Sequence, residues 1–195
     1  MIAVYIIIGV VVLVIIWFML TYNGLVGGRN QVKNAWAQID VQLKRRHDLI
    51  PNLVETVKGY MSHERQTLEA VTNARNQAQK AVGAGVGAQA QAESMLSAAL
   101  SRLLVVVEAY PNLKANENFL ALQEELTSTE NKISFSRQFY NDTVLNYNNQ
   151  TQMFPSNVVA GMTGFKPAEF FEVSVAAEKE APKVSFNVPP AQPSN

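Results

Sequence analysis

The sequence contains no cysteine, and this excludes disulfide bonds, thiolate metal sites and cysteine nucleophiles together. Histidine is scarce as well, with only His47 and His63 in 195 residues. Basic and acidic residues balance at a net charge of zero, so the chain lacks the basic excess that is typical of nucleic-acid-binding proteins. We therefore expect no nucleic-acid partner.

Charge is also missing from residues 2–20, which form one apolar run. A helix of this length rises about 28 Å, close to the hydrocarbon thickness of a bilayer. Trp17 and Tyr22 lie near its end, where aromatic rings favour the membrane interface. A cleaved signal peptide is the alternative, but it would have a charged start, a shorter apolar run and a small-residue cleavage site. We predict an uncleaved, single-pass transmembrane helix at residues 1–22 with the lipid bilayer as its partner.

The flanks of this helix predict its orientation. No basic residue precedes it, whereas Arg29 and Lys33 follow it closely. Because basic flanks favour the cytoplasmic side, we expect a short N-terminus outside and a cytoplasmic body. Three glycines should loosen the chain after the helix, so residues 23–28 are predicted to form a Gly-rich linker.

Charge is distributed unevenly over the rest of the chain. Residues 29–80 carry nine basic and five acidic side chains, a net charge of +4, and the remaining residues carry a net charge of −4. One interpretation is that two halves of one helical bundle complement each other. The other is that the basic half faces anionic lipid headgroups.

Apolar residues between positions 29 and 60 recur at spacings of four and three, the heptad pattern of a coiled coil or of a helix that packs against partner helices. Pro51 does not shift this pattern, because Leu43, Ile50 and Val57 stay seven residues apart. We therefore predict that Pro51 kinks a continuous helix rather than ending it, which leaves the carbonyl of His47 without its helical donor. The apolar seam consists of Val32, Trp36, Ile39, Leu43, Arg46, Ile50, Leu53, Val57 and Tyr60.

A turn is predicted near residue 60, because the seam loses its phase there and Gly59 is a residue type that ends helices. A second helix then covers residues 62–80. The alternative is one long helix through residues 59–62, but such a helix would leave its membrane-proximal half without a partner.

A linker of small residues at 81–91 precedes a third helix, which Pro111 stops, and a fourth helix covers residues 116–149. The first and fourth helices match in length, and so do the shorter second and third. We predict an all-α fold in which residues 29–176 form an antiparallel up-and-down four-helix bundle.

The last part of the chain carries weaker patterns. Pro155 and Pro167 could each open a short helix. Residues 177–195 are polar and proline-rich, and we expect a disordered tail. Four phenylalanines are predicted to pack on the bundle: Phe154, Phe165, Phe170 and Phe171.

Two stretches resemble the LemA family of bacterial membrane proteins: "YNGLVGGRNQVKNAWAQIDVQLKRRHDLIPNLVETVKGYMSHE" and "AYPNLKANENFLALQEELTSTENKISFSRQFYNDTVLNYN". The resemblance covers about residues 22–171, and the QLKRR-DLIPNLV string is specific. An Ala-Arg pair that is usual in the family is Ser136-Arg137 here. The resemblance implies a bacterial plasma (inner) membrane protein with an amino-terminal transmembrane helix, a short external N-terminus and a helical bundle. It implies no enzymatic activity and no agreed molecular role beyond an association with membrane stress and quality control.

Enzymatic motifs are missing from the sequence. Metal sites in helical bundles commonly use Glu-x-x-His pairs, and neither His47 nor His63 has a Glu three residues before it. The stretch "HERQT" lacks the second histidine of a zincin, and no nucleophile elbow is present. We predict no catalytic residue, no cofactor and no metal.

A repeat on the fourth helix is a candidate interaction face. Tyr140-Asn141 and Tyr147-Asn148 lie seven residues apart and therefore on one side of the helix. One interpretation is a stripe that binds a peptide or a second copy. The other is that the rings lie in the core with polar groups at the rim.

Arg46 falls on the apolar seam, between Leu43 and Ile50. It could extend to solvent along its apolar stem, or pair with a carboxylate in the core. If the two long helices are antiparallel and their midpoints are level, residue 46 faces residue 130. We predict an Arg46–Glu130 ion pair that fixes the register of the two helices, with Glu125 as the next candidate.

Two functions without catalysis are consistent with these features. One is a membrane-anchored adaptor that holds an unknown membrane or cytoplasmic protein in membrane stress or quality control. The other is a structural scaffold that self-assembles as a homo-oligomer on the membrane surface, because tethering raises local concentration.

Overall fold

The computed structural model describes residues 1–61 and 63–172, and every regular element in these residues is a helix. The predicted all-α fold with an amino-terminal apolar helix is confirmed. The predicted disordered tail, residues 177–195, lies outside the described residues. The helices are α1 (Ile2–Lys58), α2 (Arg65–Lys80), α3 (Val86–Val107), α4 (Pro111–Lys114), α5 (Glu117–Gln152) and α6 (Ser156–Thr163).

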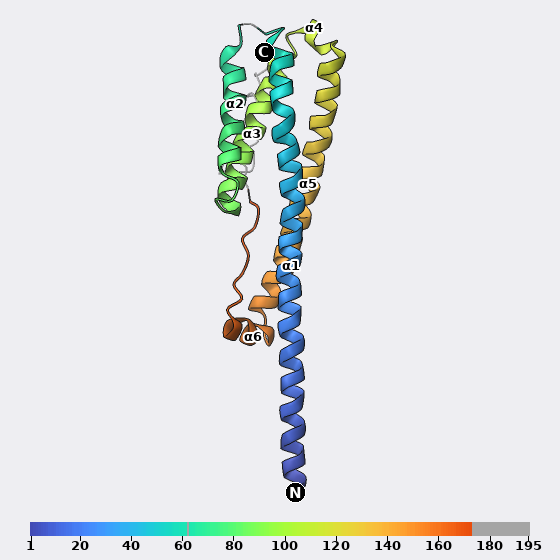
Figure 1. Ribbon diagram of the computed structural model, residues 1–195, viewed down its shortest axis with the longest axis vertical. Coiled ribbons are helices and arrows are strands. Elements are labelled where there is room, and N and C mark those ends of the chain that lie inside the picture. The colour runs from blue at the N-terminus through green and yellow to red at the C-terminus, as the bar shows by residue number, and fades with distance from the viewer. Residues whose placement is uncertain (62, 173–195) are drawn as a thin grey trace, which may run out of the picture.

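The long helices alternate in direction, and the apolar end of α1 projects beyond the rest of the molecule (Figure 1). The predicted turn near residue 60 is confirmed, because α1 ends at Lys58 and α2 begins at Arg65. α1 packs along α5, and α2 packs against both α3 and α1. The backbones of α3 and α5 scarcely approach each other, so the body is open along that side.

The predicted break at the Gly-rich linker, residues 23–28, is wrong, because α1 is one continuous helix through these residues. A glycine inside a helix costs only about 1 kcal/mol, which packing can offset. Gly28 is buried, and a Cβ atom there would lie 2.9 Å from Oε1 of Gln150 and 3.1 Å from Cδ2 of Tyr147. This glycine therefore permits close packing of α1 against α5.

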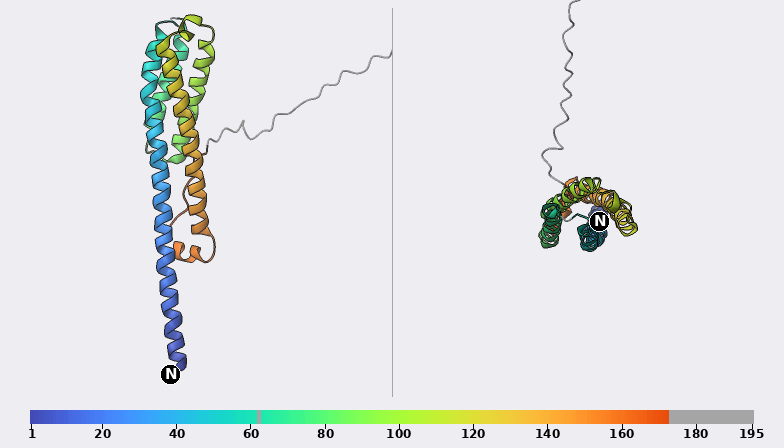
Figure 2. Two further views of the ribbon diagram at one scale, coloured as in Figure 1. Left: turned by 90° about the vertical axis from the view of Figure 1, so that its right-hand side faces the viewer. Right: turned by 90° about the horizontal axis from the view of Figure 1, so that it is seen from above.

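From Val32 to Val57 the apolar seam of α1 faces the core, and the helix continues through Pro51. One apolar cluster joins the C-terminal part of α1 to α2, α3 and the start of α5. A second cluster joins the middle of α1 to α5 and Phe171. Figure 2 shows from the side that α1 and α5 run side by side toward the end from which the apolar part of α1 projects. Of the predicted seam, Trp36 is half-buried and Tyr60 is exposed.

The segment after α5 differs in part from prediction. α6 follows Pro155 as expected, but Pro167 opens no helix, because residues 165–172 run without helical structure along α5. Phe171 is buried and Phe165 is half-buried. Phe154 is 82% exposed and Phe170 is 36% exposed, so neither ring is buried on the bundle as predicted.

Candidate functional site

Arg46 lies at the centre of the body and is only 1% exposed. Its Nη1 atom donates to Oε2 of Glu130 at 2.7 Å and to Oγ of Ser97 at 2.9 Å. The structure thus brings together the two residues of the predicted Arg46–Glu130 pair, which join α1 to α5. That this pair sets the register remains a prediction. Glu125 instead contacts Arg45, at 2.6 Å and at the surface.

A second carboxylate, Glu93 on α3, pairs with Nη2 of Arg46. Oε1 of Glu93 lies 2.8 Å from Nε2 of His47, and both side chains are buried. Burial acts to raise the pKa of the Glu93 carboxyl, but the hydrogen bond from His47 and the charges of Arg46 and His47 outweigh it. The pKa of Glu93 is therefore lowered from its ordinary value of 4.5, and the carboxylate is ionised at neutral pH.

The carbonyl that Pro51 leaves free also has a partner. Nε of Arg75, on α2, donates to the carbonyl oxygen of His47 at 2.7 Å. Arg46, His47 and their partners therefore connect α1 to α2, α3 and α5 through charge-assisted hydrogen bonds. The three ion pairs of Arg45 and Arg46 join the basic half of the sequence to the acidic half, which favours complementation within one body.

The sequence did not predict Glu93 as the buried carboxylate of this cluster, and it did not predict Ser97 or Arg75 as partners either. Leu96, Leu100, Leu103 and Val107 form the apolar stripe of α3, and the same spacing of three and four extends backward from Leu96 to positions 93 and 89. Both positions hold polar residues, and both Glu93 and Gln89 are buried. A polar residue at a position that continues an apolar stripe is expected to be buried. The sequence therefore contained a signal that Glu93 could be a buried partner of Arg46.

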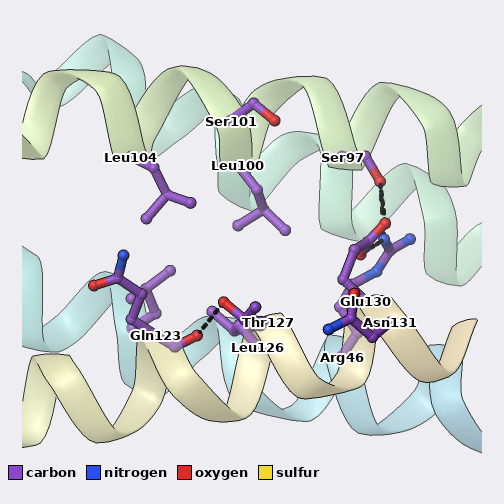
Figure 3. Close-up of a pocket in the computed structure, with 11 residues that line it drawn as sticks. Arg46, Ser97, Leu100, Ser101, Leu104, Gln123, Leu126, Thr127, Glu130 and Asn131 are labelled. Atoms are coloured by element: carbon purple, nitrogen blue, oxygen red, sulfur yellow. Dashed lines mark hydrogen bonds and ion pairs between the residues drawn. The ribbon is translucent and has the colours of Figure 1, made fainter. Parts of the chain in front are cut away.

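A groove between α3 and α5 lies directly beside Arg46 (Figure 3). Leu100 and Leu104 of α3 point into it from one wall, and Leu126 of α5 lies on the other. Its volume is about 240 Å³, and it exists because the two helix backbones stay apart. Polar side chains surround these leucines: Ser97, Ser101, Gln123, Thr127, Glu130 and Asn131.

The charged pair closes one end of the groove. The Glu130 side chain is half-exposed, although its carboxylate accepts from Arg46. Beyond it lies a second hollow of about 210 Å³, which Glu93, Arg137 and Phe171 also line. The groove thus offers apolar sites next to an accessible carboxylate, an arrangement that suits side chains of another helix.

The repeat Tyr140-Asn141 and Tyr147-Asn148 binds a peptide segment of the chain itself, residues 165–172. The Asn148 side chain donates to the carbonyl oxygen of Ala168 at 3.0 Å and accepts from its backbone N–H at 2.7 Å. Asn141 makes the same pair of contacts with Phe171, at 3.3 and 2.9 Å. Each amide therefore satisfies both backbone groups of one residue.

The tyrosine hydroxyls add to this binding. Tyr147 donates to the carbonyl oxygen of Lys166 at 3.1 Å, and Tyr140 donates to that of Glu169 at 2.9 Å. Burial, and then the charge of Glu169, raises the pKa of Tyr140 to about 12, so its hydroxyl keeps its proton. The rings are buried, so the structure combines core packing with peptide binding at this stripe. We name these contacts the Tyr-Asn ladder.

The spacing of the Tyr-Asn ladder follows from backbone geometry. Seven residues of α5 advance about 10.5 Å, and three residues of an extended chain advance about 9–10 Å. Asn148 and Asn141 therefore meet residues 168 and 171, and the segment runs antiparallel to α5. Phe171 packs at the end of the ladder. Its ring centroid lies 5.8 Å from that of Trp36 and 5.0 Å from Cζ of Arg137.

Two helices of the described chain are long and apolar enough to cross a membrane, α1 and α3. In α3, Leu96 and Leu103 are buried in the core, so this helix belongs to the body. The apolar stretch of α1 has no buried side chain. Within residues 1–61 and 63–172, no three His, Asp or Glu side chains are grouped as a metal site would need.

The unpacked apolar end of α1 and the helical body define a membrane-associated helical protein. The chain belongs to the LemA family, whose sequence profile matches residues 35–186. Magnetosome protein MamQ 2 of Paramagnetospirillum magneticum is 25% identical over 192 residues, covering 86% of this chain and 71% of that protein. Protein LemA of Metamycoplasma hominis is 24% identical over 152 residues, covering 78% of this chain and 69% of that protein.

Proposed function

We propose that this protein is a membrane-anchored, non-enzymatic adaptor in membrane stress or protein quality control, and that its α3/α5 groove binds an amphipathic helix of a partner protein. The observation that carries the proposal is the groove itself. Its leucines come from two helices that do not close on each other, although an apolar core would normally be covered. At about 240 Å³ it is smaller than a typical small-molecule pocket of about 300–1,000 Å³.

The groove suggests the chemistry of its occupant. Leu100 and Leu104 lie four residues apart on α3, so a partner helix would present apolar side chains at the same spacing. The half-exposed Glu130 carboxylate favours a basic side chain at one end of that helix. The names of the relatives denote no enzyme, which supports the non-enzymatic part of the proposal.

The proposal places α1 in the bacterial plasma membrane and the body in the cytoplasm. Arg29 and Lys33, which follow the apolar run, support this orientation. Because the chain has no cysteine, a Val105→Cys variant carries one exposed thiol on the body. A membrane-impermeant maleimide added to intact cells, or to spheroplasts, should leave this thiol unlabelled until the membrane is opened. Immediate labelling would reverse the orientation.

Site-specific photocrosslinking in native membranes tests the adaptor. A benzoylphenylalanine residue at Leu104 faces the groove, and one at the neighbouring Val105, which is 72% exposed, faces solvent on the same helix. We expect adducts with another protein from position 104 and none from position 105. Equal yields at both positions, or no adduct at 104, would contradict binding in the groove.

A scaffold made of several copies is the second candidate, and exposed rings on α5 favour it. Phe135 is 73% exposed and Phe139 is also exposed, and both would be covered by a second copy. A benzoylphenylalanine at Phe135 would then yield adducts with the mass of two chains. Self-adducts at position 135, with no adduct to another protein at position 104, would favour the scaffold function over the adaptor function.

A further inference from the structure

α6 lies across the end of the body from which the apolar part of α1 projects (Figure 1). Its inner face, Val159 and Ala160, packs on Leu25 of α1, and Phe18 adjoins this contact. Residues 18 and 25 lie about 10 Å apart along a helix, and the apolar run ends between them at Leu20. α6 is therefore held at the level where the apolar run of α1 ends.

The distribution of charge marks the same level on both segments. α1 has no charged side chain before Arg29, and the chain has none between Asp142 and Lys166. These two uncharged stretches meet, because the Arg29 guanidinium lies 5.0 Å from the ring of Phe165, the residue before Lys166. The first charges of α1 and of the segment after α6 thus come together just beyond α6.

The outer face of α6 is apolar and uncovered. Val158 and Met162 lie four residues apart in α6, which places them on one side, and Phe154 lies in the turn that precedes the helix. Phe154 is 82% exposed, Met162 is 75% exposed and Val158 is also exposed. Scattered apolar residues are normal on a protein surface, but a group of large ones next to the apolar run of α1 indicates that lipid or another protein covers this face.

We infer that α6 is a membrane-interface element, and that Phe154, Val158 and Met162 insert at the boundary between headgroups and acyl chains of the bilayer that α1 enters. Short apolar helices bind this boundary through buried area, and α6 alone is too short to bind tightly. The anchor removes that difficulty, because it holds α6 at the interface at high effective concentration. Arg29 and Lys166 then lie at the height of the headgroups, where anionic lipids attract them.

Single-cysteine labelling of the full chain tests the inference, since the natural sequence has no cysteine. A Met162→Cys variant carrying an environment-sensitive fluorophore is reconstituted in phosphatidylcholine–phosphatidylglycerol vesicles. Val105→Cys is the matched control, because it is equally exposed but lies near the far end of α3. We expect the label at 162 to be quenched by lipid-attached nitroxide and several-fold less by aqueous iodide than the label at 105.

Three outcomes would overturn the inference. If iodide quenches positions 162 and 105 equally while the chain floats with the vesicles, α6 lies in water. If the label at 162 is protected from both quenchers, a protein copy covers α6. If a label at Leu13→Cys, in the apolar run, is quenched by iodide, the anchor itself is not in lipid. Val158→Cys carries the same expectation as Met162→Cys and replaces it should that variant fail to fold.

Discussion

Arg46 has two carboxylate partners with different surroundings. Glu93 is buried with it, whereas the Glu130 side chain is half-exposed to solvent. Solvent screens a half-exposed pair, so its contribution is about 1 kcal/mol or less. Removing one partner of a buried pair typically costs about 3–5 kcal/mol, because the other charge is left uncompensated. Burial therefore predicts that Arg46 is coupled more strongly to Glu93 than to Glu130.

Double-mutant cycles measure this difference. Arg46→Met combined with Glu93→Leu should show a larger coupling free energy of unfolding than Arg46→Met combined with Glu130→Leu, for which we expect about 1 kcal/mol. Chemical denaturation in detergent micelles gives both values. Strict additivity for Arg46 and Glu130 would mean that this pair does not hold the two long helices in register.

The lowered pKa of Glu93 predicts how stability depends on pH. A carboxyl whose pKa is lower in the folded than in the unfolded state contributes stability that is fully present above its unfolded pKa, about 4.5. This contribution is lost as the pH falls from there through the folded pKa. Glu93→Gln should therefore flatten the acid limb of the curve of stability against pH, whereas Glu124→Gln, at an exposed position, should not. Identical acid limbs in the two variants would exclude the buried pair as a cause.

At the scale of single elements, α1 depends on a contact from another helix where Pro51 interrupts its hydrogen bonds. Arg75 supplies the donor that the His47 carbonyl lacks. We expect Arg75→Met to cost about 1–3 kcal/mol, since a partly buried acceptor loses its partner. In a Pro51→Ala background the new N–H of residue 51 replaces that donor, and the cost of Arg75→Met should shrink. Equal costs in the two backgrounds, by thermal or chemical unfolding, would contradict this role of Arg75.

The Tyr-Asn ladder is also specific to one element, since it fixes residues 165–172 through backbone contacts. Asn148→Ala should raise the exchange rate of the Ala168 amide, and Asn141→Ala that of Phe171, by about threefold to tenfold. Asn146→Ala removes the same side chain from an exposed position of α5 and is the control. Unchanged exchange at residues 168 and 171 would show that packing of Phe171 alone holds the segment.

For the molecule as a whole, the periodicity of apolar residues predicted which helix faces are buried and how the long helices lie against each other. The heptad seam located the buried face of α1, and the matched lengths of the long helices placed Arg46 opposite Glu130. These inferences succeeded because burial and helical rise apply along the entire helix. The same spacing, extended backward on α3, indicates that position 93 is buried.

Features decided by a single tertiary contact were not predictable. Glycines at residues 23–28 favoured a linker, but α1 is helical there and Gly28 packs closely against α5. Pro167 favoured a helix, but the Tyr-Asn ladder holds its segment extended through backbone atoms, which carry no sequence signal. The exposed ring of Phe154 was also missed, because apolar residues that face a membrane resemble those that face a core.

If the α3/α5 groove holds a helix of a partner protein, closing the groove should prevent that helix from binding. Ser101→Cys and Thr127→Cys, on opposite walls, can be bridged by a reducible bis-methanethiosulfonate linker in the chain with benzoylphenylalanine at position 104. Bridging Asn73→Cys to Met95→Cys, in a hollow between α2 and α3, is the matched control. We predict that only the first bridge abolishes the partner adduct and that reductant restores it. An adduct that persists with the groove bridged would show that the partner helix does not bind in the groove.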